Sequence, residues 1–292
     1  MNLTNLFQNI LLPITATISF IQNHFKATVL VLVVFFIYQN SNSEELVTPN
    51  LKTIHLDGAI MDASFVLEEI EKTKKDDSIK GVLLDVNSPG GAVAPSIEIA
   101  YAIKELNQIK PVIAYASGTM ASGSYYSSIF ASKIVANPGS MIGSIGVIME
   151  SVDASSLMSK LGIKTQTVKM GTYKEAGTPT RKWTKEELAE LNKVILGTYD
   201  MFVQDVANAR KLKIEDKNKY ADAHIFTASQ AKDVGLVDTV ATMTQAKKMV
   251  EVAAKVQDPV WDKKDKMDKF LDKLANETIS KIALTGSKLV AY

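Results

Sequence analysis

The side chains that could act as nucleophiles in this chain are those of serine, threonine and lysine. The 292 residues include no cysteine and three histidines, His24, His55 and His224. Thiolate nucleophiles, thiolate zinc sites, iron–sulfur clusters and disulfides are thereby excluded. Three histidines also leave little for a histidine base or a histidine metal cage. Chemistry in this chain therefore depends on Ser, Thr, Lys, Asp, Glu or the backbone.

A serine-rich turn, SGTMASGSYY at 117–126, follows an apolar run that is typical of a strand. Small residues at a strand-to-helix turn can place Ser122 Oγ at the start of the helix, beside the amide of Gly123. Serines at a helix start are also common caps. Taken alone, the turn is compatible with either role.

A second turn, SPGG at 88–91, directly follows another predicted strand and precedes a helix. Amides at the C-terminal end of a strand lie at the usual ligand edge of an α/β sheet, and they suit an oxyanion. The sequence contains no GxxxxGK[ST] phosphate loop and no GxGxxG after a strand. An ordinary strand-to-helix turn is the alternative interpretation.

A serine nucleophile needs a base, and neither a GxSxG elbow nor a well-placed histidine supplies one. A lysine can serve where burial lowers its pKa from about 10.4 toward 7. Only Arg181 and Arg210 are arginines among the 33 Lys and Arg, so 33 minus 2 leaves 31 lysines. Most of these are expected in solvent. Lys174 stands out because it lies in a glycine-punctuated loop, GTYKEAGTP at 171–179.

The elements that must position these residues alternate between strand and helix from residue 52 onward. This alternation indicates an α/β fold with mainly parallel strand pairing. A long amphipathic helix is predicted at Thr184–Arg210, because Thr184 and Glu187 form a capping-box pattern. The predicted strands are 53–60, 81–86, 111–116, 133–136, 146–149 and 165–168, the other predicted helices are 64–74 and 96–106, and a helix-strand unit is predicted at 227–240.

Residues 1–43 contain no acidic residue and one lysine, Lys26. Their most apolar run, ATVLVLVVFFIY at 27–38, would reach only about 18 Å as a helix, short of the roughly 30 Å hydrocarbon core. Flanking residues would have to complete a span. A membrane anchor is favoured over a cleaved signal peptide or a buried core helix, because no positive charge precedes Lys26 and no clear cleavage site follows the run.

Composition also predicts the division of the chain. We expect a membrane anchor at 1–43, a main domain at 44–257 and a charged amphipathic tail at 258–292. Lys26 before the apolar run, with Glu44 and Glu45 after it, favours an N-terminus in the cytoplasm and the rest of the chain outside. The 33 basic side chains against 32 acidic ones give a formal charge of +1, so we expect no nucleic-acid partner.

Four motifs occur in an order that resembles the signal peptide peptidase A family, in its short single-domain bacterial form. They are SPGG at 88–91, ASGSYY at 121–126, GSIGVIMES at 143–151 and GTYKEAGTP at 171–179. The resemblance covers about residues 54–240. It implies a Ser-Lys serine protease of the Clp/crotonase-like superfamily, with a fold of repeated β-β-α units preceded by a transmembrane helix.

Matching positions carry the family's roles onto this chain. The resemblance implies Ser122 as the nucleophile, Lys174 as the general base and Ser144 as the residue that orients the lysine amine. Ser124 departs from the glycine usual after SG, which raises a question about the turn geometry. The oxyanion hole would be formed by amides of Gly90, Gly91 and Gly123.

The expected function is that of a membrane-anchored serine endopeptidase that degrades cleaved signal peptides and other hydrophobic unfolded peptides. The resemblance implies a location in the inner (plasma) membrane, with the catalytic domain on the extracytoplasmic side. It also implies a homo-oligomeric ring, in which Lys174 can come from a neighbouring subunit, and no metal or organic cofactor. Two alternatives stay open: a catalytically inactive membrane scaffold of the same fold, and a crotonase-type acyl-CoA enzyme that uses carboxylates.

Overall fold

The computed structural model describes residues 20–41, with side chains through Phe35, and residues 48–262. Chain contacts divide the protein into two units, Met1–Thr48 and Pro49–Tyr292, and each unit is described by itself. The predicted domain boundary after residue 43 lies outside the described residues, as does the predicted tail beyond residue 262.

The first unit contains the helix α2 (Phe25–Ser41). The six consecutive side chains from Val29 to Val34 are between 41% and 66% exposed. Successive residues of a helix are rotated by about 100°, so this part of α2 has an apolar surface all around. No helix in the described ranges combines the length and the apolarity needed to cross a membrane. The membrane anchor therefore stays a prediction.

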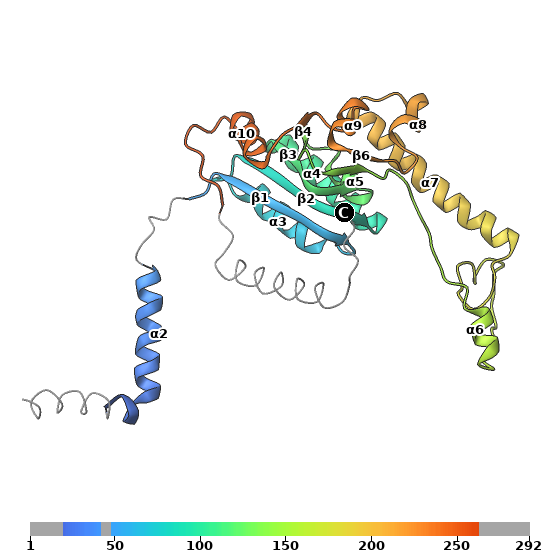
Figure 1. The fold of residues 1–292 in the computed structure, drawn as a ribbon, viewed down its shortest axis with the longest axis horizontal. Helices are drawn as coiled ribbons and strands as arrows, with labels where there is room; N and C mark the ends of the chain where they lie inside the picture. The colour runs from blue at the N-terminus through green and yellow to red at the C-terminus, as the bar shows by residue number, and fades with distance from the viewer. Residues whose placement is uncertain (1–19, 42–47, 263–292) are drawn as a thin grey trace, which may run out of the picture. The chain divides into compact units, whose positions relative to one another are not determined.

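The second unit is built on a seven-stranded sheet (Figure 1). Strands β1, β2, β3, β4 and β7 lie side by side in that order, and each of these pairings is parallel. This arrangement confirms the predicted α/β fold with mainly parallel pairing. Of the other two strands, β5 pairs in parallel with the end of β3 and antiparallel with β6. The bounds are β1 (Leu51–Ile60), β2 (Gly81–Gly91), β3 (Val112–Ala121), β4 (Lys133–Ala136), β5 (Met141–Gly143), β6 (Ile225–Thr227) and β7 (Thr239–Val240).

Alternate side chains of the strands fill two cores on opposite faces of the sheet, because successive strand residues point to opposite sides. Leu84 and Ala114 belong to the larger core. Leu83 and Ile113 belong to the smaller one, which α10 covers with Val250 and its neighbours. The helices around the sheet are α3 (Ser64–Lys75), α4 (Val93–Ile109), α5 (Gly123–Ser128), α8 (Lys217–Tyr220) after the short 3-10 turn η1 (Ile214–Asp216), α9 (Ala228–Asp233) and α10 (Met243–Ala253).

Each of the three long strands changes register or partner near its middle. The register of β1 against β2 shifts after Asp57, and that of β2 against β3 shifts after Val86. Strand β3 pairs with β4 through residues 113–116 and with β5 through residues 119–121. The three long strands are continuous in spite of these changes, and the β-β-α order implied by the resemblance stays a prediction.

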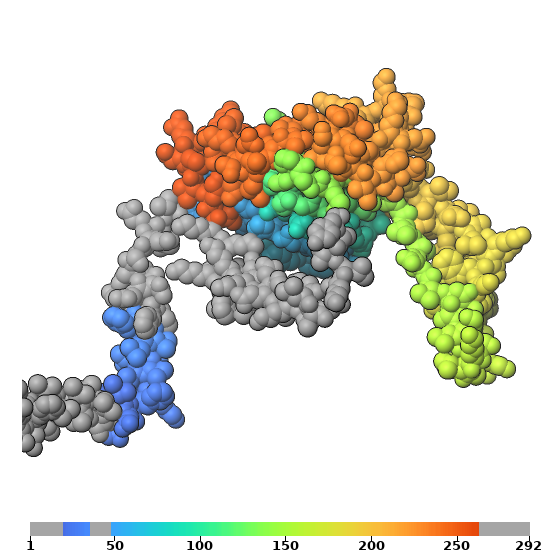
Figure 2. Space-filling view, in the orientation of Figure 1, coloured from blue at the N-terminus to red at the C-terminus, as the bar shows by residue number. Residues whose placement is uncertain are grey.

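Residues 147–183, called the arm below, leave the sheet next to α7 (Figures 1 and 2). The arm contains α6 (Ser155–Lys160) and leads into α7 (Lys185–Arg210), which begins with the predicted capping box of Thr184 and Glu187. The second half of α7 packs on the larger core through Phe202, Val203 and Val206.

Two predicted strands, 146–149 and 165–168, are wrong. Neither segment forms a strand, and Val168 is fully exposed. A β-branched run forms a strand only where another strand satisfies its backbone hydrogen bonds. In the described part of the chain no strand lies beside these segments.

In the described part of the second unit, its first residues are hydrogen-bonded to residues 258–262. Asn50 N and Leu51 N donate to Val260 O at 2.9 and 3.1 Å, and Asn50 Oδ1 accepts from Val260 N at 2.8 Å. The carboxylate of Asp262 accepts the N–H of Thr53 at 2.8 Å. Burial raises the pKa of Asp262. Residues 258–262 thus cover the first part of the outer edge of β1.

Candidate active site

Ser122 lies where β3 ends and α5 begins. Its backbone has φ 54° and ψ −125°, a conformation that costs a residue with a Cβ about 1–3 kcal/mol. Ser122 N donates to Gly143 O at 2.8 Å, and Tyr126 N donates to Ser122 O at 3.0 Å, so the turn is held from both sides. The side chain makes no capping hydrogen bond to α5 and lines a pocket. This geometry favours presentation of the hydroxyl over helix capping.

The SPGG turn lies directly against Ser122. Gly90 has φ +95°, and a Cβ there would come within 2.6 Å of Gly123 N and 2.8 Å of Ser122 Cβ. A Cβ on Gly91 would collide with the backbone of Ile60 in β1. The structure therefore brings together the three glycines that were predicted to form an oxyanion hole.

The amides of these glycines are not equally available to a ligand. Gly90 N already donates to the buried Ser88 Oγ at 3.1 Å. Gly123 N belongs to the first turn of α5, where amides have no intrahelical acceptor. Gly123 is therefore a better candidate donor to an anion than Gly90, which shapes the turn. Gly91 N is the other candidate, because it lies 3.3 Å from where a Cβ on Gly123 would be.

Ser144 follows β5, the strand whose Gly143 carbonyl accepts the Ser122 amide. It also has a positive φ, 51°, and its own N–H donates to His224 O at 2.6 Å. The structure thus brings Ser144 to the same strand ends as Ser122. Sequence reasoning considered only the ring of His224, whereas the contact uses its carbonyl, and a backbone contact of this kind leaves no signal in the residue types.

An open pocket lies beside Ser122. Its walls come from the start of α4, from α5, from residues 146–148 and from the second half of α7. The lining contains no charged side chain. A pocket of this composition suits an apolar side chain of a ligand. The large apolar residues of the lining are Val93, Ile97, Tyr126, Val147, Ile148, Met201 and Phe202.

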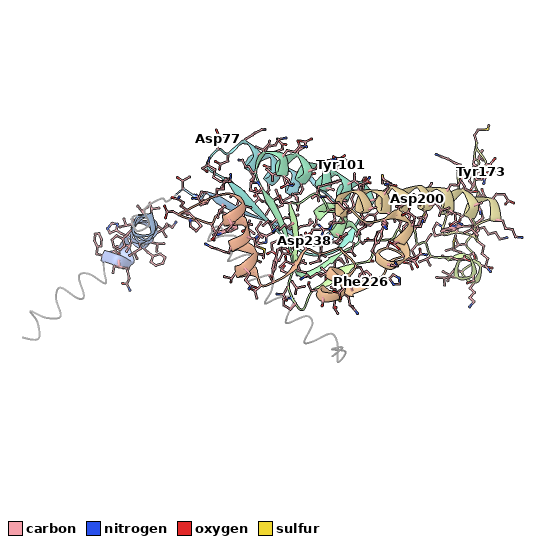
Figure 3. The ribbon with its side chains drawn as sticks, turned by 90° about the horizontal axis from the view of Figure 1, so that it is seen from above. Asp77, Tyr101, Tyr173, Asp200, Phe226 and Asp238 are labelled. Carbon is pink, nitrogen blue, oxygen red and sulfur yellow. The ribbon has the colours of Figure 1, made fainter. Side chains whose placement is uncertain are left out.

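Lys174 is exposed and lies in the arm, in a turn of residues 171–177 whose last three residues are half-buried. It is not among the residues that line the Ser122 pocket. Its neighbour Tyr173 lies at the end of α7 farthest from the sheet, well away from Asp238 (Figure 3). The described chain therefore does not bring Lys174 to Ser122.

Ionic contacts fasten the Lys174 turn to the start of α7. Arg181 donates two hydrogen bonds to Glu187, at 2.8 and 2.7 Å, and one to Glu175 at 3.2 Å. Lys169 Nζ lies 2.6 Å from Glu175. The hydrogen bond from Lys169, followed by that from Arg181, lowers the pKa of Glu175 to about 2, and the hydrogen bonds from Arg181 lower the pKa of Glu187 to about 2. These four side chains are called the arm cluster below.

The second unit is an α/β domain in which a serine on a strained strand-to-helix turn lies beside backbone amides and an apolar pocket. In residues 20–41 and 48–262 no three His, Asp or Glu side chains gather as a metal site would require. The profile of peptidase family S49 matches residues 104–257, just over half of the chain. The chain belongs to this family.

Individual relatives agree with this assignment. The chain is 46% identical over 198 residues to a provisionally named protease of Methanocaldococcus jannaschii. The alignment covers 68% of this chain and 64% of the relative. It is 38% identical over 178 residues to a provisionally named signal peptide peptidase of Enterococcus faecium, and the alignment covers 60% of this chain and 51% of the relative. It is 30% identical over 190 residues to the chloroplastic serine protease SPPA of Arabidopsis thaliana, and this alignment covers 65% of this chain and 28% of the relative. The chain thus spans less than two thirds of the length of each of these relatives. Among solved structures, ClpP1 of Listeria monocytogenes aligns with 66% of this chain and 93% of its own, at 17% identity and a TM-score of 0.45.

The arm cluster makes the order of the arm depend on pH. The pKa of Glu175 and of Glu187 is depressed from 4.5 to about 2, so their contribution to stability is complete above about pH 4.5 and is lost as the pH falls through about 2. We expect the hydrogen-exchange protection of residues 171–184 to decrease as the pH is lowered from about 4.5 to about 2. Arg181→Ala loses that protection already at neutral pH.

The matched control is Arg210→Ala, which removes the other arginine and its ion pair with Asp238 outside the arm. It leaves the protection of residues 171–184 unchanged. Equal protection of this segment in Arg181→Ala and in the wild type at neutral pH would contradict the role of the arm cluster.

Proposed function

We propose that this protein is a serine-type endopeptidase that cleaves apolar peptides, with Ser122 as its nucleophile. The observation that carries the proposal is the strained turn at Ser122, which holds an uncapped hydroxyl beside Gly91 and Gly123 and in the wall of an apolar pocket. Membership of peptidase family S49 supports the reaction class. The substrates are remnant signal peptides and other unfolded hydrophobic segments, whose side chains suit the pocket.

The reaction is an acyl transfer. Ser122 Oγ attacks the peptide carbonyl while its proton passes to a base. The amides of Gly91 and Gly123 donate to the oxyanion of the tetrahedral intermediate, and one such donor is typically worth about 3 kcal/mol. The base returns the proton to the leaving amine, and a water activated by the same base then releases the acyl group. No step requires a metal or an organic cofactor.

We assign the base to Lys174 of a second copy of the chain. Within one copy Lys174 lies far from Ser122, and the arm that carries it exposes large apolar side chains. Exposed apolar surface of this kind is typical of contact sites, and desolvation in a contact favours the neutral amine that a lysine base needs. In a closed ring of identical subunits each arm would meet a neighbouring serine, and Ser144 would orient the amine. The exposed apolar residues of the arm include Ile148, Val152, Leu157, Leu161, Val168 and Met170.

The proposal includes attachment to the plasma membrane, with the second unit outside the cytoplasm. The exposed apolar residues of α2 from Val29 to Val34 support this part, as does the lack of acidic residues in 1–43. An apolar helix surface of this kind is stabilised by transfer from water into lipid.

The two alternatives are weaker. A crotonase-type acyl-CoA enzyme would need carboxylates at the reacting carbon, and the lining of the Ser122 pocket contains none. A catalytically inactive membrane scaffold is an outcome of the test that follows.

The nucleophile and the base are tested by substitution in the full chain. We expect Ser122→Ala and Lys174→Ala each to lower kcat for a fluorogenic apolar peptide by about 10⁴-fold or more, because the two groups act as a unit. Lys133→Ala, which removes an exposed lysine at the start of β4, leaves kcat unchanged. Full turnover by Ser122→Ala would contradict the assignment of Ser122 as the nucleophile. A wild type without turnover would favour the catalytically inactive membrane scaffold.

The origin of the lysine is tested by mixing the two inactive variants. If each site combines the serine of one copy with the lysine of another, refolding an equimolar mixture of Ser122→Ala and Lys174→Ala restores activity in about a quarter of the sites, because a quarter receive both intact groups. No recovery would show that both groups of a site come from a single chain.

Membrane attachment is tested by flotation with vesicles of phosphatidylethanolamine and phosphatidylglycerol. We expect the full chain to float, and Leu30→Asp in α2 to reduce the floating fraction, because a carboxylate in an apolar membrane segment costs about 2.5–3.5 kcal/mol. Val252→Asp places the same charge at an exposed position of α10 and leaves flotation unchanged. Equal flotation of the two variants would argue against α2 as the attachment point.

A further inference from the structure

Ser124 is fully buried in the first turn of α5, and its hydroxyl contacts backbone groups from two strand ends. Ser124 Oγ lies 2.6 Å from Ser88 O and 2.9 Å from both Ala121 O and Ala121 N. A hydroxyl has one proton, so Ser124 donates to one carbonyl while it accepts the N–H of Ala121. The shorter distance makes Ser88 O the main acceptor.

This hydrogen bond bridges a gap in the sheet. Strands β2 and β3 pair in regular register from Val82 to Val86, after which the register shifts and Ser88 opposite Met120 is the last pair. In the described chain, the sheet therefore provides no ladder between the SPGG turn and the end of β3 beyond that point. The Ser124 hydroxyl adds a connection at Ser88, the last paired residue of β2.

The connection continues through Ser88 into the glycine turn. Ser88 Oγ accepts the N–H of Gly90 at 3.1 Å, and Ser88 itself is fully buried. Ala121 N–H therefore donates to Ser124 Oγ, Ser124 Oγ–H donates to the Ser88 carbonyl, and Gly90 N–H donates to the Ser88 side chain. These hydrogen bonds join the strand that precedes the nucleophile to the turn that carries the oxyanion-hole amides.

The next serines of α5 behave differently. Ser128 Oγ bonds to the Ser124 carbonyl four residues earlier, at 2.8 Å, which is ordinary for a serine in a helix. Ser127 Oγ lies 2.9 Å from Gly123 O and 3.0 Å from Ser96 O in α4. Ser128 is as completely buried as Ser124. It therefore provides a matched position at which the loss of a buried hydroxyl leaves both strand ends alone.

We propose that Ser124 is a positioning residue whose hydroxyl sets the distance between Ser122 and the oxyanion-hole amides. The inference rests on the proposed peptidase reaction. Removal of the hydroxyl leaves the Ser88 carbonyl and the Ala121 N–H buried without this partner, and the SPGG turn is then free to shift. Because the amides act on the oxyanion and not on the bound peptide, their displacement lowers kcat and leaves the affinity for the substrate unchanged.

The experiment compares Ser124→Ala with Ser128→Ala in the full chain. We expect Ser124→Ala to lower kcat for an apolar peptide about 10- to 100-fold, less than the 10²- to 10³-fold loss on deleting a donor outright, with KM unchanged. The affinity for a peptide boronic acid, which forms a tetrahedral adduct with the serine, falls by the same factor. Ser128→Ala changes none of these values, and thermal melting shows that both variants are folded.

Ser88→Ala is the second variant, because it breaks the link to Gly90 without a change in α5. We expect it to lower kcat and boronate affinity together. The proposal is overturned if Ser124→Ala and Ser88→Ala match Ser128→Ala in both measurements, or if they raise KM alone. A different result would show that the proposed peptidase reaction is wrong. In that case the wild type and Ser122→Ala hydrolyse the peptide at the same rate, or neither hydrolyses it, and the proposed role of Ser124 is then wrong as well.

Discussion

The end of strand β3 is the constraint on which the candidate site depends. Ser122 has a backbone conformation that residues with a Cβ avoid, with φ 54°, and it is held there by the Gly143 carbonyl on one side and the first turn of α5 on the other. The neighbouring Tyr125 and Ile142 are fully buried. Their burial offsets the strain of about 1–3 kcal/mol at this turn. A relaxed turn would place the hydroxyl and the Gly123 amide in different directions.

The site divides into a rigid part and an arm. Ser122, Ser144 and the glycine turns lie on sheet ends that are packed against the larger core. Lys174 lies instead on a segment fixed by the four charges of the arm cluster, two positive and two negative, with few buried side chains. The arm is thus ordered by ionic contacts near its junction with α7. Lys174 therefore belongs to the arm and not to the sheet that carries Ser122.

The sequence predicted those parts of the site that depend on the sheet. SPGG and Ser122 converge because both follow parallel strands, whose C-terminal ends share one edge. The cap of α7 at Thr184 was predictable because it is local. The strands predicted at 146–149 and 165–168 were wrong because pairing, and not residue type, decides whether such a run is a strand. The position of Lys174 relative to Ser122 was not predictable, since no local pattern fixes the direction of an exposed arm.

The contact of residues 258–262 with the start of β1 has a mechanical consequence. Force applied through the residues before Asn50 and after Asp262 enters this unit at a single corner, where Asn50 and Leu51 bond to Val260 and Thr53 bonds to Asp262. The load falls on these few hydrogen bonds at the edge of β1, while β2 and β3 lie behind it in the sheet. When the chain is pulled before Asn50 and after Asp262, we therefore expect the hydrogen bonds of residues 258–262 to break before the strand ends around Ser122 are distorted.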